Sequence, residues 1–396
     1  MTRTWSTVTP HNPCPICGKP DWCSRSAADW IACRRVSTGN GIHRVDKAGV
    51  DYWLYPPENA THTNRPAVDL PVHSAPQRAS PDTLHHVYHA LLALLTLTAR
   101  HRQNLRRRGL SDGEIARRRY RTLPAHGRAE LAGFLVDRFG QEVCAGVPGL
   151  HLKMEGGRRW WTVTGMPGLL IPVLDLHGRI TALVIRSDDP ETGPRYSSFS
   201  SKRYGGPGSG AHVHIPLCEG LLTATVRVTE GPLKADVATV LSGILTVGLP
   251  GASMWRRGIP VLASLQAQRV ILAFDADARR KWAVAQALQG VADALQAAGF
   301  AVLLEVWPEQ HGKGFDDLLV AGHRPEVVEG RAMQQVIQAV VCTARLARPH
   351  HEAPTRSRRG ALRDWQVTRA LARQREAEEI ARCLLGRRRE GIGDDR

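Results

Sequence analysis

Apolar and polar positions along residues 226–322 alternate between the period of strands and the period of helices. Short β-branched and apolar runs are each followed by a segment with helical spacing. This pattern predicts strands at 226–229, 244–247, 269–274 and 301–307, and helices at 233–241 and 281–298. Strands that alternate with helices in this order predict a parallel α/β sheet.

Two other patterns precede this region. Residues 83–139 follow a helical pattern, and Ser111 and Glu114 have the S-x-x-E spacing of a capping box, which predicts a helix start. Residues 141–219 instead hold short apolar runs at 160–163, 169–173 and 180–185, separated by Gly and Pro. His177-Gly178 stands between two of these runs and predicts a β-hairpin. We therefore expect a basic helical segment, 83–140, and a mixed α+β subdomain, 141–219.

Cysteines mark an N-terminal module over residues 1–57. Four of the eight cysteines cluster there, namely Cys14, Cys17, Cys23 and Cys33. The first two form a C-x-x-C knuckle, and the other two can complete a tetrahedral, structural Zn²⁺ site. His11 or His43 can replace one cysteine, and free reduced thiols are the alternative interpretation. A linker rich in Pro, Thr, Ser and His is expected at 58–82, a sheet domain with a C-terminal helix at 220–345, and an Arg-rich tail at 346–396 with a helix at 362–385.

The composition favours a soluble protein that binds a polyanion. The chain has 396 residues, a formal net charge of +16 and a pI near 10.1, which indicates nucleic acid as the simplest partner. Residues 100–121 alone hold nine Arg and two acidic residues. Because apolar runs are short and no secretory signal pattern is present, we expect a cytoplasmic protein without a membrane partner.

Three acidic motifs follow the predicted strands of the sheet. They are Glu230-Gly231-Pro232-Leu233-Lys234-Ala235-Asp236, Asp275-Ala276-Asp277 and Lys313-Gly314-Phe315-Asp316-Asp317. Ligands of open parallel sheets bind beyond the carboxyl ends of the strands, so the three motifs can meet in one crevice. An isolated D-x-D is more often a helix cap or a solvated charge, and only the ordered set indicates a site.

The residue types in these motifs suit chemistry on phosphates. Carboxylates are hard ligands for Mg²⁺ or Mn²⁺, and paired ions assist nucleotidyl transfer or phosphodiester cleavage. Asp275 and Asp277 are the candidate metal ligands, with Glu230 as a third ligand or general base. Asp316 or Asp317 would complete the metal site. Lys234 can meet a phosphate as a point charge.

Residues 225–322 resemble the TOPRIM domain of DnaG-type primases, topoisomerases and some nucleases. The hallmarks are a Glu-Gly pair after the first strand and a D-x-D after a later one. Residues 168–186 and 195–198 resemble the subdomain that precedes TOPRIM in DnaG-type primase cores. From this resemblance, Arg186, Lys202 and Arg203 become candidates for phosphate contacts, and Lys313 becomes a candidate for nucleotide or nucleic-acid binding.

The order of zinc module, α+β subdomain and TOPRIM domain is also the domain order of primases. The chain is most similar to a primase-like TOPRIM family of phages, plasmids and mobile elements that carries EG-x-x-KAD and KG-x-DD motifs. The resemblance implies an α/β fold in which a mixed subdomain and a zinc-ribbon-like module precede a parallel-sheet catalytic domain. No G-x-x-x-x-G-K-[ST] phosphate loop occurs in the sequence, so a helicase is expected on a separate chain.

These observations predict a primase-like nucleotidyltransferase that makes primers on single-stranded DNA from nucleoside triphosphates. A 3′-hydroxyl would attack a nucleotide α-phosphate with the help of Mg²⁺ or Mn²⁺, in replication of a mobile element, plasmid or phage. Two alternatives stay open: a TOPRIM nuclease that uses water as nucleophile, and a DNA-binding adaptor without catalysis.

Overall fold

The computed structural model describes residues 5–9, 11–35, 42–45, 51–56, 76–191, 194–218 and 224–347. The described residues all belong to one compact unit, Met1–Arg348. Most of the predicted linker, and the predicted helix at 362–385 in the tail, lie outside the described residues. Among the helices that are described, none is both long and apolar enough to cross a membrane.

The N-terminal module is an antiparallel five-stranded sheet in the order β1-β2-β3-β5-β4. Its strands are β1 (Trp5–Thr7), β2 (Ser24–Ser26), β3 (Ile31–Cys33), β4 (Ile42–Val45) and β5 (Asp51–Tyr55). The small core combines Val8, Ile31 and Tyr55 with the buried cysteines of the cluster. So few apolar side chains make a weak core, which is the situation in which small modules rely on a metal.

Residues 76–145 form helices whose starts are set by side-chain caps. The elements are α1 (Pro81–Leu94), α2 (Ala99–Arg107), α3 (Asp112–Arg117), β6 (Arg121–Leu123), α4 (Arg128–Phe139) and α5 (Gln141–Ala145). The hydroxyls of Ser80, Thr98 and Ser111 each accept a hydrogen bond from a backbone N–H of the first turn. The expected helix start at Ser111 is confirmed, although a short strand, β6, interrupts the helical pattern.

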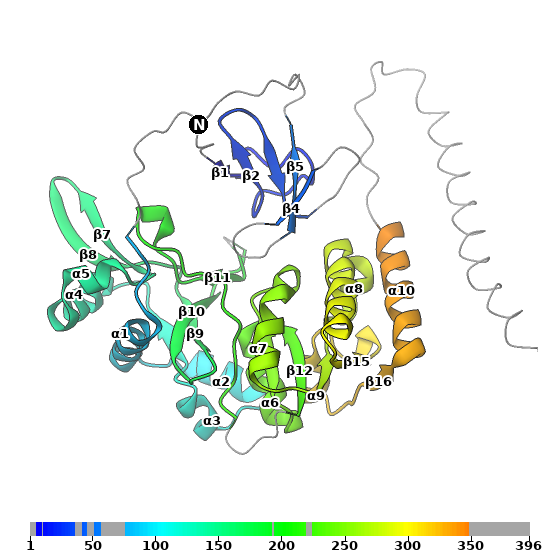
Figure 1. Ribbon diagram of the computed structural model, residues 1–396. Coiled ribbons are helices and arrows are strands. Elements are labelled where there is room, and N and C mark those ends of the chain that lie inside the picture. Colours follow the sequence, from blue (N-terminus) through cyan, green and yellow to red (C-terminus); the bar gives the residue numbers. More distant parts are fainter. Residues whose placement is uncertain are drawn as a thin grey trace, which may run out of the picture. The chain divides into compact units, whose positions relative to one another are not determined.

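Residues 150–204 contribute two separate antiparallel sheets (Figure 1). Their elements are β7 (Leu150–Glu155), β8 (Arg158–Val163), β9 (Gly168–Leu174), β10 (Ile180–Ser187), β11 (Tyr196–Ser198) and η1 (Lys202–Tyr204). One sheet has the order β11-β10-β9-β6, and the other is the β7–β8 hairpin. The hairpin expected around Gly178 is the β9–β10 pair, with Gly178 at φ +70° in its turn. The mixed α+β character expected of this part is therefore observed.

Residues 224–347 build a five-stranded sheet in the order β13-β12-β14-β15-β16. The strands are β12 (Thr225–Glu230), β13 (Thr246–Leu249), β14 (Arg269–Leu272), β15 (Ala301–Val306) and β16 (Glu326–Glu329). The intervening helices are α6 (Pro232–Ser242), η2 (Ala252–Arg257), α7 (Gly258–Ser264), η3 (Ala276–Arg280), α8 (Trp282–Ala297), η4 (Glu309–His311), α9 (Phe315–Val320) and α10 (Gly330–Leu346). The first four strands in this order are parallel, as the sequence predicts, whereas β16 is an antiparallel edge strand that the pattern does not reveal.

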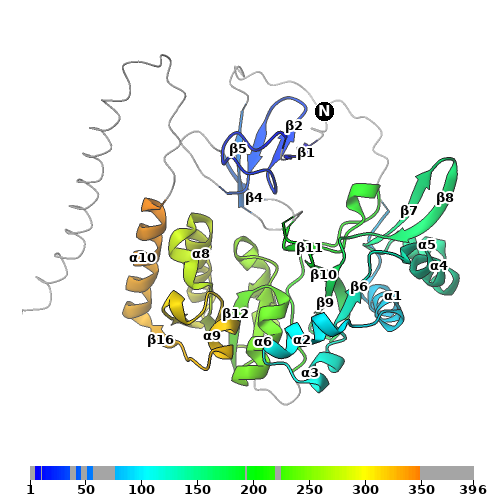
Figure 2. The same cartoon turned by 180° about the vertical axis from the view of Figure 1, so that it is seen from behind.

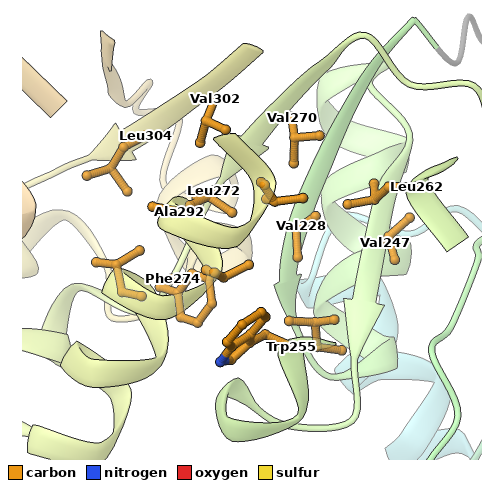
Figure 3. Close-up of a cluster of buried hydrophobic side chains, with 14 of the residues drawn as sticks. Val228, Val247, Trp255, Leu262, Val270, Leu272, Phe274, Ala292, Val302 and Leu304 are labelled. Carbon is orange, nitrogen blue, oxygen red and sulfur yellow. The ribbon is translucent and has the colours of Figure 1, made fainter. Parts of the chain in front are cut away.

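Helices cover both faces of this sheet, because each strand buries residues on both sides. On one face, alternate valines and leucines of β12 to β15 pack against α7, α8 and α10, with Trp255 and Phe274 at one end of the cluster (Figure 3). Helices α8 and α10 lie side by side in both views (Figures 1 and 2). Near-continuous apolar strands of this kind are typical of parallel sheets.

The opposite face, under α6 and α9, carries a buried ion pair. The Arg227 guanidinium of β12 donates from Nε and Nη2 to the Glu305 carboxylate of β15, at 2.8 and 2.9 Å. The ring of Phe315 on α9 lies 4.2 Å from the same guanidinium. A two-point Arg–carboxylate contact fixes the relative position of its partners, so this pair holds β12 and β15 in place on either side of β14.

Candidate active site

The three acidic motifs meet at the carboxyl edge of the parallel strands. Glu230 ends β12, Asp275 and Asp277 follow β14, and Asp316 stands at the start of α9 after β15. Since β12, β14 and β15 are neighbours, their ends bring the motifs together. The N–H of Ala276 donates to the Lys313 carbonyl at 2.9 Å, which joins the second motif to the third.

Glu230 sits in the turn between β12 and α6. Gly231 has φ +84°, a backbone conformation that favours glycine, and this lets the chain pass from strand to helix within one residue. Burial raises the pKa of the Glu230 carboxyl, and the nearby Asp275 carboxylate raises it further. When one of two neighbouring carboxyl groups is ionised, ionisation of the other is unfavourable unless a cation lies between them.

Lys234, one helical turn after Glu230, forms an ion pair with Asp275. Burial works against the charge on Lys234, but the surrounding carboxylates, Asp275 foremost, together raise the lysine pKa. The carboxylates of Asp316 and Glu230 act on Lys234 in the same direction. Lys234 therefore interacts with one carboxylate from each of the three motifs.

Asp277 is almost fully buried and is held by two lysines. Its Oδ2 accepts from Lys281 Nζ at 2.7 Å and from Lys313 Nζ at 3.2 Å. Burial opposes its charge, but these two lysines lower the pKa of Asp277 below its ordinary value. The other oxygen, Oδ1, is buried without a hydrogen-bond partner among the described residues. A buried carboxylate oxygen left in this way is available to a ligand.

Asp316 and Asp317 have different roles in the structure. Asp316 is 1% exposed, pairs with Arg108 through Oδ2, and keeps a buried Oδ1 without a partner in the described part of the chain. A Cβ at position 314 would lie 2.6 Å from that Oδ1, which explains the glycine between Lys313 and Phe315. Asp317 is exposed and accepts from the Gly314 N–H at 3.3 Å, so it caps α9. Asp316 is the one of the two that lies against Lys234.

The nine arginines of the basic segment 100–121 are of two kinds. Six are exposed, whereas three hold the fold together. Arg108 pairs with Asp316, Arg118 is 4% exposed, and Arg121 donates to the Leu92 carbonyl at 2.9 Å. The phosphate-binding capacity of the segment is therefore smaller than its nine arginines suggest, because these three are engaged within the protein.

Arg118 belongs to a buried network around Asp236, the last residue of the first motif. The Asp236 carboxylate accepts from Arg118 Nε at 2.9 Å and from the Tyr120 hydroxyl at 2.5 Å, and it pairs with His214 Nε2 at 3.2 Å. Burial opposes its charge, but His214 and Arg118 lower the pKa of Asp236. Because Asp236 and Lys234 share helix α6, this network fixes the helix that carries Lys234.

A cavity of about 310 Å³ opens beside Glu230 and Lys234. Its opposite wall comes from β10, β11 and the segment after η1, and includes Tyr196, Ser198 and His212. Burial lowers the pKa of His212 to about 4, so its ring is neutral at physiological pH. The cavity therefore offers hydroxyl and ring groups on one wall and charged groups on the other.

The remaining predicted phosphate contacts lie outside the residues that line this cavity. Arg186 is half-buried on β10 across from Tyr196 on β11, and burial lowers its pKa. Lys202 and Arg203 are exposed in η1. Sequence reasoning missed Lys281 and Arg108, which contact the second and third motifs. Lys281 follows Asp277 by four residues, a spacing that signals a local pair, whereas nothing in the sequence links Arg108 to Asp316.

The four cysteines of the N-terminal module form the one compact group of metal-ligand atoms found among the described residues. Their Sγ atoms all lie within 4.8 Å of one another. Hydrogen bonds from Cys23 and Cys33 lower the pKa of Cys14, and the same interactions raise the pKa values of Cys23 and Cys33. Ionisation of one thiol thus disfavours ionisation of its neighbours. A divalent cation bound by the thiolates would compensate their mutual repulsion. His11 is exposed, and the His43 side chain lies outside the described side chains.

Comparison with known proteins gives one family model and several solved structures. Residues 222–325 match the model "Domain of unknown function (DUF3854)". The zinc-binding and RNA polymerase domains of Aquifex aeolicus primase are 15% identical, with a TM-score of 0.45, over 63% of this chain and 63% of that one. The RNA polymerase domain of Mycobacterium tuberculosis primase DnaG is 16% identical, with a TM-score of 0.46, over 68% and 86%.

A DNA primase domain from Pseudomonas aeruginosa is 20% identical, with a TM-score of 0.43, over 65% of this chain and 78% of that one. Comparison with curated proteins finds no match. DnaG primase domains are thus among the structures to which this chain is similar.

The raised pKa of Glu230 predicts a pH-dependent stability. A folded-state pKa above the ordinary 4.5 means that ionised Glu230 costs stability, and this cost grows as the pH rises from about 4 through the raised pKa. In metal-free buffer, Glu230→Gln should therefore raise the thermal unfolding midpoint at neutral pH and lose that advantage below about pH 4. Glu326→Gln, which removes an exposed carboxylate, is the control. It should leave the thermal unfolding midpoint unchanged both at neutral pH and below about pH 4. A lower midpoint for Glu230→Gln at neutral pH would contradict the assignment.

Proposed function

We propose that the chain is a primase-like nucleotidyltransferase whose TOPRIM-type domain spans 220–345. The observation that carries this proposal is the convergence of three carboxylate motifs at one sheet edge, with two buried oxygens, Oδ1 of Asp277 and of Asp316, that lack partners in the described structure. Burying carboxylate oxygens without partners costs stability. Acidic residues that are gathered in spite of this cost indicate a site that binds cations.

The residues of this edge fit Mg²⁺ or Mn²⁺. Glu230, Asp275, Asp277 and Asp316 would supply hard oxygen ligands, as Mg²⁺ prefers. When bound, the ion would stabilise negative charge that develops on the transferred phosphoryl group. Glu230 has a raised pKa and a position beside the cavity, which suit a general base that accepts the proton of a 3′-hydroxyl.

The lysines give the site its capacity for phosphates. Lys234, Lys281 and Lys313 now neutralise Asp275 and Asp277. In the proposed function the same ammonium groups hold the phosphates of a nucleoside triphosphate, while the carboxylates hold the metal ion. Arg186, Lys202 and Arg203 are the proposed contacts to the backbone of the DNA template, and Asp317 serves as a helix cap. From the resemblance we carry over replication of a mobile element, plasmid or phage, with a helicase as partner.

The N-terminal module, 1–57, is proposed to be a zinc-ribbon-like module. Its four Sγ atoms are close enough together to share one ion, and all four ligand positions are filled by the protein. A site closed in this way is structural and leaves no position for a substrate.

The carboxylates should be needed for synthesis and not for DNA affinity. Asp275→Ala and Asp277→Ala should each lower Mg²⁺-dependent incorporation of labelled nucleotide on single-stranded DNA by at least about a hundredfold, since metal stabilisation amounts to several kcal/mol and about 1.4 kcal/mol is tenfold. Binding of the same DNA should stay within about twofold, because removal of an anion does not weaken phosphate contacts. Asp137→Ala, on the exposed side of α4, is the matched control.

The same assay separates the alternative functions. Cleavage of labelled DNA without incorporation would establish a nuclease. Neither activity from the wild type, with and without a helicase, would establish a DNA-binding adaptor and contradict the proposal.

Zinc binding is tested on the full chain by elemental analysis. We expect one Zn²⁺ per chain in the wild type and in Cys342→Ser, which changes an exposed cysteine outside the cluster. Cys17→Ser should lose the metal, because it removes one of four ligands from a closed site. A wild type without stoichiometric zinc would leave the cluster as reduced thiols.

A further inference from the structure

The β7–β8 hairpin is an arm that extends beyond its own core contacts. Among the described strands, β7 and β8 pair only with each other, and Gly156 and Gly157 form the turn with φ +56° and +77°. Two positive φ values in a row produce the tight turn that matches the twist of a hairpin. Leu150 and Val163 at the base are buried in the core, whereas Met154 near the tip is 70% exposed.

The outer half of the arm gains little from burial. An isolated two-stranded hairpin is only marginally stable in water, and this one is supported by helix α4, which packs against β8. Even so, its outer residues include the exposed Met154 and the half-buried Trp160, and Trp160 is not among the side chains that pack on the buried core. Trp161, on the other face, packs against the core instead. The residue types of the outer half are therefore explained better by contact with another molecule than by folding.

One face of the arm combines flat rings with positive charge. Lys153 and Trp160 are cross-strand partners, and the ammonium lies 5.3 Å from the ring centroid. At the base of the same face, His151 stacks on Tyr204, with centroids 4.0 Å apart and planes at 8°. Tyr204 is 52% exposed, so with one ring face on His151 the rest of the ring faces solvent.

Positive charges surround these rings. The arm and η1 hold five cations and one carboxylate, Glu155: the cations are Lys153, Arg158, Arg159, Lys202 and Arg203. By strand alternation, Lys153 and Arg158 share the face of Trp160, whereas Arg159 lies on the other face near the tip. Lys202 and Arg203 belong to η1, the element that ends in Tyr204. Lys153 pairs with Glu155 at 2.6 Å, while the four others are exposed. The arm and η1 together form a basic surface with exposed rings, which we term the arm surface (150–163 and 202–204).

We propose that the arm surface binds single-stranded nucleic acid, at a contact separate from the carboxylate site. Exposed rings accept unpaired bases by stacking, and adjacent cations hold the phosphates, a combination typical of single-strand binding. An acidic protein partner would use the cations and give no role to the exposed ring of Tyr204. The choice of nucleic acid over other polyanions rests on the proposed function.

The charge component is tested by matched double variants of the full chain. Arg158→Ala with Arg159→Ala removes two cations from the arm, and Arg324→Ala with Arg331→Ala removes two exposed cations elsewhere, so both proteins have the same net charge. The probe is a labelled single-stranded oligodeoxynucleotide of mixed sequence, followed by fluorescence anisotropy at several salt concentrations. The arm variant should bind about tenfold more weakly, with a salt slope reduced by about 1.4, because each phosphate contact contributes about 0.7.

The control variant should keep wild-type affinity and slope. Equal losses in the two variants would mean that net charge alone acts, and would overturn the proposal. If the arm variant lost affinity only for duplex DNA and not for the single strand, the proposal would be overturned as well, since the arm would then contact a groove of the duplex.

The stacking component is tested at Tyr204. Tyr204→Ala should weaken single-strand binding by about fivefold or more, whereas Tyr204→Phe should bind like the wild type, because only the ring is needed. Equal affinity of all three proteins would exclude stacking. Unchanged thermal unfolding midpoints establish that each variant is folded.

The binding assays contain neither Mg²⁺ nor nucleotides. Normal arm binding without any synthesis would therefore contradict the proposed function alone, and synthesis with unaffected binding in the arm variants would contradict this inference alone.

Discussion

The buried carboxylate of Asp236 is the contact on which the candidate site depends. Three donors from two segments outside its own helix converge on it, namely Arg118, Tyr120 and His214. Removal of one partner from a buried ion pair costs about 3–5 kcal/mol, since the other charge is left without compensation. The network therefore holds α6 against the helical segment and the antiparallel sheet. Apolar contacts of Leu233 and Val237 with Leu105 and Tyr120 reinforce the same junction.

This junction separates two kinds of charged residue within one motif. Asp236 is fully engaged by the protein and belongs to the framework. Lys234, two residues earlier on the same helix, faces Asp275 and the cavity. The third motif repeats the division: Asp317 caps α9, while Asp316 keeps one buried oxygen without a partner in the described structure. In these two motifs, the framework acid fixes the backbone from which the acid or lysine of the site projects.

The sequence predicts much of this fold because its signals are local. Alternation of strands and helices, the C-x-x-C knuckle and the Ser111 cap each depend on residues close together in the chain. Strand β16 escapes prediction, because Glu326-Val327-Val328-Glu329 carries no apolar run and becomes a strand only by pairing with β15. The β7–β8 hairpin has a Gly156-Gly157 turn, a local signal that identifies it in retrospect.

The candidate site, too, could be predicted from the sequence only in part. The three acidic motifs could be predicted, since each follows a strand and the ends of parallel strands meet. The partners of these motifs could not. Arg108 and Asp316 are 208 residues apart, and Arg118 and Asp236 are 118 apart, so only the folded chain distinguishes a structural arginine from one that binds phosphate.

The proposed chemistry requires that the carboxylates of the three motifs bind a divalent cation. The test is Mn²⁺ binding to the full chain in the presence of a nucleoside triphosphate, measured in electron paramagnetic resonance as the loss of free-ion signal beyond the loss that the same nucleotide causes without protein. The wild type should bind Mn²⁺, whereas Asp277→Asn with Asp316→Asn should not, because it converts to amides the two carboxylates of the site that keep a buried oxygen without a partner in the described structure. Equal Mn²⁺ binding by the two proteins, or none by the wild type, would contradict it.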